Sequence, residues 1–190
     1  MNKYDLLIKN GMIHTAVESF EAEIGVSEGK ITAIGQNLGH AERVIDAEGM
    51  LVLPGGIDAH CHIEQESSTR IMTADDFYSG SVSAAFGGNT TFLPFAAQHR
   101  GQSLREVVDT ARERARNKAV IDYGLHLIIS DPTQNVLEEE LPSLIKEGYT
   151  SFKVYMTYEM LKINDGEILD ILAIARRHGA LTMVHAENNE

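Results

Sequence analysis

The chain has 190 residues, of which 43% are hydrophobic and 23% are charged, and its formal net charge is −12. This composition is typical of a globular protein, and acidity spread along the whole chain argues against nucleic acid or an anionic membrane surface as a partner. The chain has no apolar run approaching the ~18 residues of a membrane span, no apolar secretory signal at its start and a single cysteine, which together predict a cytoplasmic protein without internal disulfides.

The first fifty residues predict three or four short strands and no helix. Alternating apolar residues are separated there by turn signals at Asn10-Gly11, Glu28-Gly29 and Glu48-Gly49. The expected strands cover residues 4–9, 21–26, 30–34 and 43–46. An antiparallel sheet of this size is marginal by itself and needs a packing partner.

The pattern changes at Pro54-Gly55-Gly56, after which apolar strands alternate with helical segments. Further strands are expected at residues 50–53 and 57–60, 90–95, 120–129, 151–155 and 181–185. Helices are expected at residues 73–87, 103–118, 137–145 and 164–178. Two helix starts show the spacing of a capping box, at Thr73 with Asp76 and at Ser103 with Glu106.

Strands that are continuously apolar and alternate with helices indicate an α/β fold, with a parallel sheet covered by helices. Five strands and four helices are about half of a (β/α)8 barrel, which usually takes about 250 residues. A doubly wound sheet fits the same alternation, although no G-x-G-x-x-G follows the first strand. Because the chain stops directly after a strand, we expect it to be the front part of a longer protein.

Three of the expected strands carry residues that can bind metals in proteins. His60 and His62 stand two positions apart, which turns both imidazoles to one side of a strand, and imidazole suits Zn²⁺. Lys153 interrupts an apolar strand, where an ammonium must be neutral, paired or modified; a neutral lysine can take up CO2 and bridge two ions as a carbamate. His185 ends the last strand. The alternatives are hydrogen-bonded structural histidines and an edge lysine whose ammonium reaches water.

Four other polar features receive simpler interpretations. Cys61 should point away from its flanking histidines as a small packed side chain, and His126 should lie in the core. Asp58 either orients a metal ligand or ends a strand. The acidic run at residues 138–140 is expected to be a solvated helix start.

In chain order, several segments resemble the amidohydrolase superfamily, in its cyclic-amidase branch of dihydropyrimidinases and hydantoinases. The sequence PGGIDAHCH at residues 54–62 resembles the family segment P-G-x-I-D-x-H-x-H. The other similar segments are residues 7–11, 73–77, 84–88, 118–123, 152–158 and 184–188. The resemblance implies that residues 1–55 are the N-terminal part of a small β-sandwich domain. Residues 56–190 would then be the first five strands and four helices of a metal-dependent (β/α)8 (TIM) barrel.

The resemblance also implies a site for two divalent metal ions, with zinc as the expected metal. His60 and His62 would bind the more buried ion, carboxylated Lys153 would bridge both ions, and His185 would bind the second. A metal-bridging hydroxide would then open the ring of a dihydropyrimidine or a 5-substituted hydantoin to an N-carbamoyl amino acid.

The resemblance assigns Tyr158 as the catalytic residue that donates to the developing oxyanion. Strand parity would instead point Tyr155 to the same side as Lys153. Glu64 stands where dihydroorotases, which also resemble this chain, have an arginine that holds the carboxylate of the substrate. A substrate that bears a carboxylate is therefore less favoured. The loop at residues 64–70 does not match the hydantoinase pattern, so allantoinase activity stays an alternative.

The family takes a further histidine and a catalytic aspartate from later strands, which have no counterpart here. We therefore expect this chain by itself to be inactive, to expose a strand edge and to associate. The full-length protein is expected to be a homotetramer. Two alternatives to an enzyme are a non-catalytic scaffold of the same fold without metal, and a doubly wound module that binds an anion.

Overall fold

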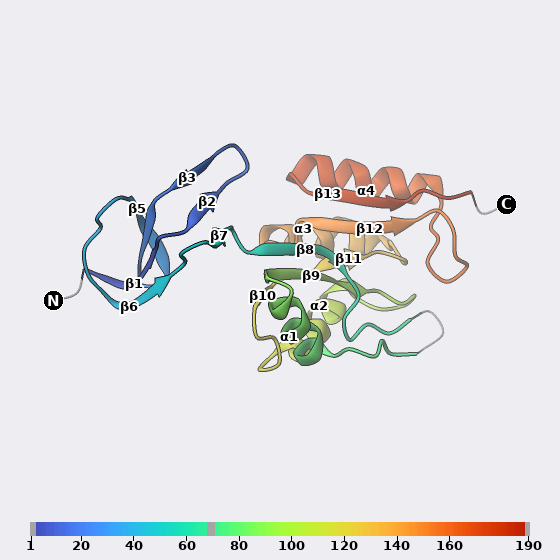
Figure 1. Ribbon diagram of the computed structural model, residues 1–190. Coiled ribbons are helices and arrows are strands. Elements are labelled where there is room, and N and C mark those ends of the chain that lie inside the picture. Colours follow the sequence, from blue (N-terminus) through green and yellow to red (C-terminus); the bar gives the residue numbers. More distant parts are fainter. Residues whose placement is uncertain (1–2, 68–70, 189–190) are drawn as a thin grey trace. The chain divides into compact units, whose positions relative to one another are not determined.

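A computed structural model describes residues 3–67 and 71–188 (Figure 1). The chain divides between Gly55 and Gly56 into two compact units, and each unit is described by itself. Among the helices in the described ranges, none is both long enough and apolar enough to cross a membrane.

The first unit consists of two small sheets, with strand orders β5-β4-β1-β6 and β3-β2-β7. Its strands are β1 (Tyr4–Lys9), β2 (Met12–His14), β3 (Ser19–Glu21), β4 (Glu23–Ser27), β5 (Lys30–Gly35), β6 (Ala41–Asp46) and β7 (Leu51–Val52). Strand β1 pairs antiparallel with β4 but parallel with β6, and β2 pairs parallel with β7.

The prediction of three or four strands was therefore too low in number, and the antiparallel arrangement holds only for some of the pairs. The hairpin between β4 and β5 has the expected turn, with Glu28 at φ 52° and Gly29 at φ 73°. Such hairpin turns leave a local sequence signal. Parallel pairs need longer crossover connections, which have no such local signal. The sequence therefore did not show that β6 pairs with β1 and β7 with β2.

The second unit is built on one parallel sheet in the order β10-β9-β11-β12-β13, with β8 paired to β9. Its strands are β8 (Gly56–Cys61), β9 (Asn89–Ala97), β10 (Asp122–Tyr123), β11 (His126–Ile128), β12 (Ser151–Tyr155) and β13 (Leu181–His185). Leaving aside the short strand β10, each strand from β9 to β13 pairs in parallel with the strand before it in the chain. This is the strand order of a (β/α)8 barrel, because a doubly wound sheet reverses direction at a switch point.

Helices connect these strands and cover one face of the sheet (Figure 1). They are α1 (Phe77–Phe86), α2 (Leu104–Ala115), the π-helical turn η1 (Val136–Glu140), α3 (Leu141–Lys146) and α4 (Asp165–His178). The main core cluster joins Leu127 and Phe152 from the sheet with Leu104, Leu141 and Ile171 from the helices. The alternate strand positions point to the other face, which in a complete barrel is the lumen.

Two expected element boundaries were wrong. The helix expected from residue 73 begins at Phe77, and its capping box joins Asp76 with Ser79 rather than with Thr73. The strand expected over residues 120–129 is interrupted between Tyr123 and His126. Both errors have a local cause, since cap geometry and short strand breaks depend on which backbone groups find partners, and apolar patterning does not record this.

The acidic run meets its expected role as a solvated helix start in part: Glu138 and Glu139 are exposed in the first turn, but Glu140 has another role. The run lies in the π-helical turn η1, and the carboxylate of Glu140 accepts a hydrogen bond from the backbone N–H of Leu104 at 2.7 Å. Leu104 is the first residue of α2, whose first N–H groups have no partner within the helix. Glu140 therefore caps a neighbouring helix, and Ser103 caps the same helix as predicted, by accepting from Arg105 and Glu106.

Candidate metal centre

The two histidines of the H-x-H segment lie side by side at the end of β8. Their ring centroids are 5.5 Å apart. Phe95 of the adjacent strand β9 contacts both rings, edge-on to His60 at 4.8 Å and stacked on His62 at 5.0 Å. The alternation of a β-strand puts both imidazoles on the sheet face away from the helices, and the phenyl ring restricts their rotation.

Cys61 points to the opposite face, as predicted. Its side chain packs with the second core cluster, which contains Phe77 and Phe92. Burial, helped by the charge of Asp58, raises the pKa of the thiol to about 11. The thiol is therefore protonated at neutral pH, and its place in this cluster separates it from the histidine pair.

Lys153 reaches the neighbourhood of the histidines from strand β12. Burial first, and then the charges of His62, Lys153 and His126, lower the pKa of His60. These contributions favour the neutral imidazole, which is the form that binds a metal ion. Nζ of Lys153 has no hydrogen bond or ion pair within the described ranges, and it lies 5.4 Å from the ring centroid of Tyr155.

His185 ends strand β13 and belongs to an aromatic group. It pairs in register with Tyr155, and the two rings stack at 5.4 Å with an interplanar angle of 19°. The ring of Tyr158 lies 5.1 Å from it. Nε2 of His185 lies 2.7 Å from a carboxylate oxygen of Glu187, so its Nδ1 is the nitrogen left for another ligand.

The four expected ligands thus form two groups on the same face of the sheet. One group is His60 with His62, and the other is His185 with its two tyrosines; Lys153 stands between them, near His60 and over the ring of Tyr155. Within residues 3–67 and 71–188 no three histidine, cysteine, aspartate or glutamate side chains are close enough to hold a metal ion. The expected set differs from such a cluster because one member is a lysine, which becomes a ligand only after carboxylation.

The donor set fits a divalent transition metal. Imidazole nitrogens and carbamate or carboxylate oxygens are ligands of zinc, and parallel barrels carry their sites at the carboxyl ends of the strands. His60, His62 and His185 occupy those ends, and the amine of Lys153 is free of competing acidic partners in the described part of the chain.

Both candidate tyrosines lie against His185, so proximity to this ring does not separate them. Tyr155 is half-buried in β12, and its burial raises the pKa of its phenol. Tyr158 lies beyond the strand end with φ 70° and is 50% exposed. The positive φ releases Tyr158 from strand parity, so a residue five positions after Lys153 can face the same region.

His126 is buried with 6% exposure, which confirms the prediction of a core position. Its Nδ1 lies 2.5 Å from the hydroxyl of Ser151, and its Nε2 lies 3.0 Å from the carbonyl oxygen of Ala59. The ring therefore ties β11 to β8, next to His60, and to the start of β12. The sequence carried no signal of these partners, which come from distant segments.

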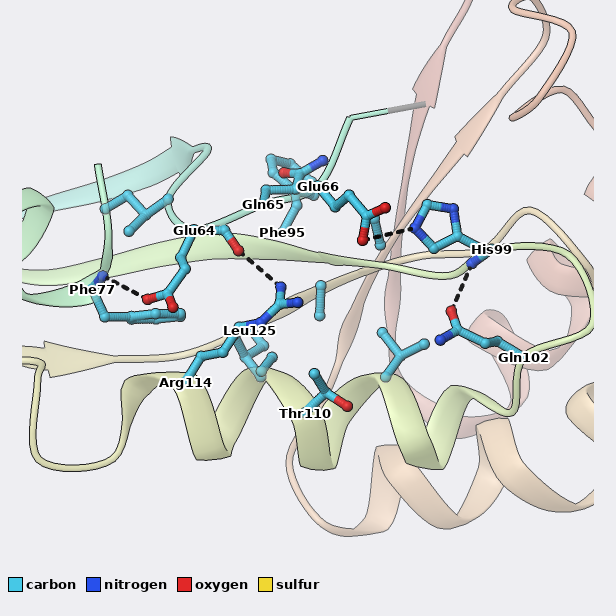
Figure 2. A pocket seen from close by; sticks show the side chains of 15 residues that line it. Glu64, Gln65, Glu66, Phe77, Phe95, His99, Gln102, Thr110, Arg114 and Leu125 are labelled. Carbon is cyan, nitrogen blue, oxygen red and sulfur yellow. Dashed lines mark hydrogen bonds and ion pairs between the residues drawn. The ribbon is translucent and has the colours of Figure 1, made fainter. Parts of the chain in front are cut away.

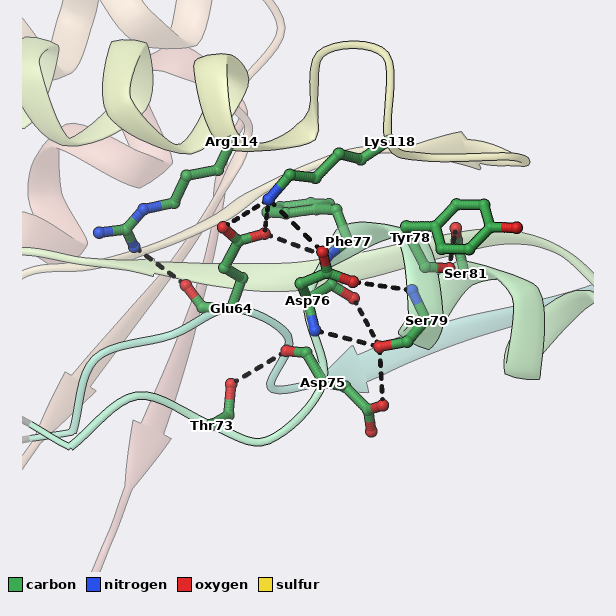
Figure 3. A network of polar contacts seen from close by, with 10 residues as sticks. All are labelled: Glu64, Thr73, Asp75, Asp76, Phe77, Tyr78, Ser79, Ser81, Arg114 and Lys118. Carbon is green, nitrogen blue, oxygen red and sulfur yellow. Dashed lines mark hydrogen bonds and ion pairs between the residues drawn. The ribbon is translucent and has the colours of Figure 1, made fainter.

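Glu64 takes part in a polar network on the helix side (Figure 3). Its carboxylate binds Nζ of Lys118 at 2.8 and 2.9 Å and accepts from the N–H of Phe77, and Lys118 also pairs with Asp76 at 3.5 Å. The hydrogen bond to Glu64 raises the pKa of Lys118, and the N–H of Ser79 lowers that of Asp76. Glu64 therefore anchors α1, and its carboxylate is engaged away from the histidine pair.

A cavity of about 70 Å³ lies between this loop and α2 (Figure 2). Its lining includes Gln65, Phe95 and Arg114 but none of the four expected ligands. Several lining side chains, such as Val107 and Leu125, belong to the core between sheet and helices. The cavity therefore lies beside the candidate metal centre and shares Gln65 and Phe95 with it, but it is not the place where the expected ligands meet. The loop expected to shape the substrate pocket continues into residues 68–70, which lie outside the described residues.

Comparisons with known proteins give one consistent result. The model of the amidohydrolase family matches residues 51–190. The D-hydantoinase of Geobacillus stearothermophilus is 48% identical over 187 residues, covering 97% of this chain and 39% of that protein. A solved D-hydantoinase structure superposes with a TM-score of 0.93 at 49% identity, covering 97% of this chain and 40% of that one. The structure of the dihydropyrimidinase of Brevibacillus agri superposes with a TM-score of 0.91 at 42% identity, covering 96% of this chain and 40% of that one. The chain spans about 40% of the length of these relatives.

Proposed function

Since the chain belongs to the amidohydrolase family, we propose that the full-length protein is a metal-dependent hydrolase of cyclic amides. Its substrates would be 5-substituted hydantoins or dihydropyrimidines, opened to N-carbamoyl amino acids. The observation that carries this proposal is a histidine pair on one sheet face with a lysine that has no hydrogen bond or ion pair among the described residues, in a chain 48% identical to a D-hydantoinase.

The metal ligands proposed from this chain are His60, His62, Lys153 as its carbamate, and His185. Two divalent ions, with zinc as the proposed metal, would polarise the amide carbonyl and supply a nucleophile at neutral pH when bound. Phe95 supports this arrangement by contacting both rings of the histidine pair.

Tyr158 is the proposed hydrogen-bond donor to the carbonyl oxygen of the ring. Negative charge grows on that oxygen as the amide carbon becomes tetrahedral, and a phenol placed there stabilises it. The exposed ring of Tyr158, beyond the end of β12 and beside His185, supports this role. Tyr155 then serves as a wall that stacks on His185.

We further propose that the full-length protein is a cytoplasmic homotetramer and that residues 1–55 contribute to a β-sandwich domain. The two small sheets of the first unit support the sandwich. A later histidine and aspartate would come from the part of the family that this chain does not span.

The test is metal content and turnover of the full-length protein. We expect about two metal ions per chain and hydrolysis of a 5-substituted hydantoin or dihydrouracil, with allantoin and dihydroorotate as comparison substrates. Lys153→Ala should lose the second ion and nearly all activity, whereas the control Lys146→Ala, on the exposed end of α3, should keep both. A wild-type protein without bound metal would support the scaffold alternative instead.

A further inference from the structure

His62 has a hydrogen-bond partner that the sequence did not suggest. Its Nδ1 lies 2.7 Å from Oε1 of Gln65. A carbonyl oxygen only accepts hydrogen bonds, so Nδ1 carries the proton and Nε2 keeps its lone pair. Nε2 has no partner within residues 3–67 and 71–188, so the nitrogen able to bind a metal ion is the free one.

The ring of His62 is held on two sides. Phe95 stacks on its face with an interplanar angle of 18°, which restricts tilting, and Gln65 holds one edge. Together these contacts set the direction of the Nε2 lone pair. In most metal sites the second nitrogen of a ligating histidine has such a partner, which fixes the tautomer and the orientation of the ring.

Gln65 is itself held firmly. Its N–H donates to the hydroxyl of Thr73 at 3.1 Å, and its carbonyl oxygen accepts from the N–H of Thr73 at 3.0 Å. Thr73 was expected to cap α1 and instead fastens this loop. These bonds fix the backbone of Gln65 at the place from which its side-chain amide reaches His62.

The residue before Gln65 anchors the loop from the other side. Glu64 has φ 45°, and its carboxylate binds Lys118 while its carbonyl oxygen accepts from Arg114 at 2.9 Å (Figures 2 and 3). Adjacent side chains thus serve different purposes: Glu64 joins the loop to the helices, and Gln65 reaches the histidine pair.

We propose that Gln65 is a positioning residue that fixes the tautomer and direction of His62 for metal binding. This inference rests on the proposed metal centre, and no step of the chemistry requires Gln65 to touch the substrate. Without an acceptor at Nδ1, the neutral ring distributes its proton over both nitrogens. The fraction protonated at Nε2 cannot bind metal through that atom, so affinity falls.

The experiment compares two replacements in the full-length protein. Gln65→Met has a similar shape and no acceptor oxygen at this place, whereas Gln65→Glu keeps one. Gln134→Met makes the same chemical change at an exposed helical position, where the amide donates to the carboxylate of Glu138, and serves as the matched control. Zinc affinity is measured by competition with a chelator, and ¹⁵N NMR of labelled histidine in the metal-free protein reports the tautomer of His62, assigned with His62→Asn.

We expect Gln65→Met to bind zinc about 10–100-fold more weakly and to lose the Nδ1–H signal. Gln65→Glu and Gln134→Met should keep the signal and bind within a few-fold of wild type. Unchanged affinity and an unchanged tautomer in Gln65→Met would overturn the inference while leaving the proposed function intact. A wild-type protein without zinc affinity would instead contradict the proposed function, and the NMR comparison would still decide whether Gln65 sets the tautomer.

Discussion

Single side chains in this molecule join segments that are far apart in the chain. His126 is the clearest case, because one buried ring reaches the backbone of β8 and a hydroxyl at the start of β12. Ala59, whose carbonyl oxygen it binds, directly precedes His60. Its contacts therefore support the strand on which the histidine pair depends.

Replacing His126 by leucine should destabilise the protein. Two hydrogen bonds are lost at about 0.5–1.5 kcal/mol each, so we expect a decrease of about 1–3 kcal/mol in the free energy of unfolding, measured by urea denaturation of the full-length protein. His40→Leu is the control, since that histidine is exposed in the first unit. Equal stability of His126→Leu and wild type would show that these contacts contribute nothing.

The two tyrosines beside His185 can be separated by kinetics. Removal of one oxyanion donor costs about 10²–10³-fold in kcat, so Tyr158→Phe should lower kcat by about this factor in the full-length enzyme and change KM less. Tyr155→Phe keeps the stacked ring and should retain most of the activity. The reverse result would move the donor role to Tyr155, as strand parity suggests.

Between elements, charged pairs connect helices that the barrel order brings together. Arg105, in the first turn of α2, binds both carboxylate oxygens of Glu147 at 2.6 Å after the end of α3. These hydrogen bonds hold the pKa of Glu147 below its ordinary value of 4.5. A carboxylate with a lowered pKa stabilises the folded state above that ordinary value, and this contribution is lost as the pH falls through the folded-state pKa.

Glu147→Gln should therefore lower the thermal midpoint at pH 7, and its difference from wild type should shrink as the pH falls below 4.5. Thermal unfolding at pH 7 and pH 3.5 measures both differences. Glu113→Gln is the control, because its pair with Arg116 is 68% exposed on both sides and should contribute little at either pH. A pH-independent difference would contradict the assignment to this carboxylate.

For the molecule as a whole, the sheet of the second unit has three strands with a single partner in the described ranges. Within these ranges, strand β8 and the short strand β10 pair only with β9, and β13 pairs only with β12. Ile57 and Leu181 on these strands are each 64% exposed. Unpaired strand edges with apolar side chains are templates for association.

Residues 1–190 produced alone should therefore associate, and should not hydrolyse dihydrouracil with added zinc. Light scattering after size-exclusion chromatography measures the association, and Leu181→Lys should reduce it because a charge on an edge strand opposes pairing. The control is Leu169→Lys, an exposed leucine on helix α4, which has no backbone groups left to pair with another strand. A monodisperse monomer would show that these strand edges do not cause association. Clear turnover would show that residues 1–190 are sufficient for catalysis.

The sequence by itself determined the class of the protein. Strand and helix follow from apolar periodicity within a few residues, so the α/β alternation and the shared side of His60 and His62 were predictable. The family resemblance is confirmed by the match over residues 51–190. Secondary structure and the shared side of the two histidines depend on neighbouring residues, and the family is indicated by the order of the motifs along the chain.

Only the tertiary structure decided which distant groups meet. Strand order brings Lys153 near His60 and lets His126 bond to the backbone of β8. It also pairs β6 and β7 parallel with β1 and β2, and the apolar pattern of the sequence does not encode strand order. Gln65 illustrates the same limit at short range: a positive φ at Glu64 and two bonds to Thr73 turn its amide to His62. Pattern reports which side chains avoid water, whereas partner choice depends on where the folded backbone brings each polar group.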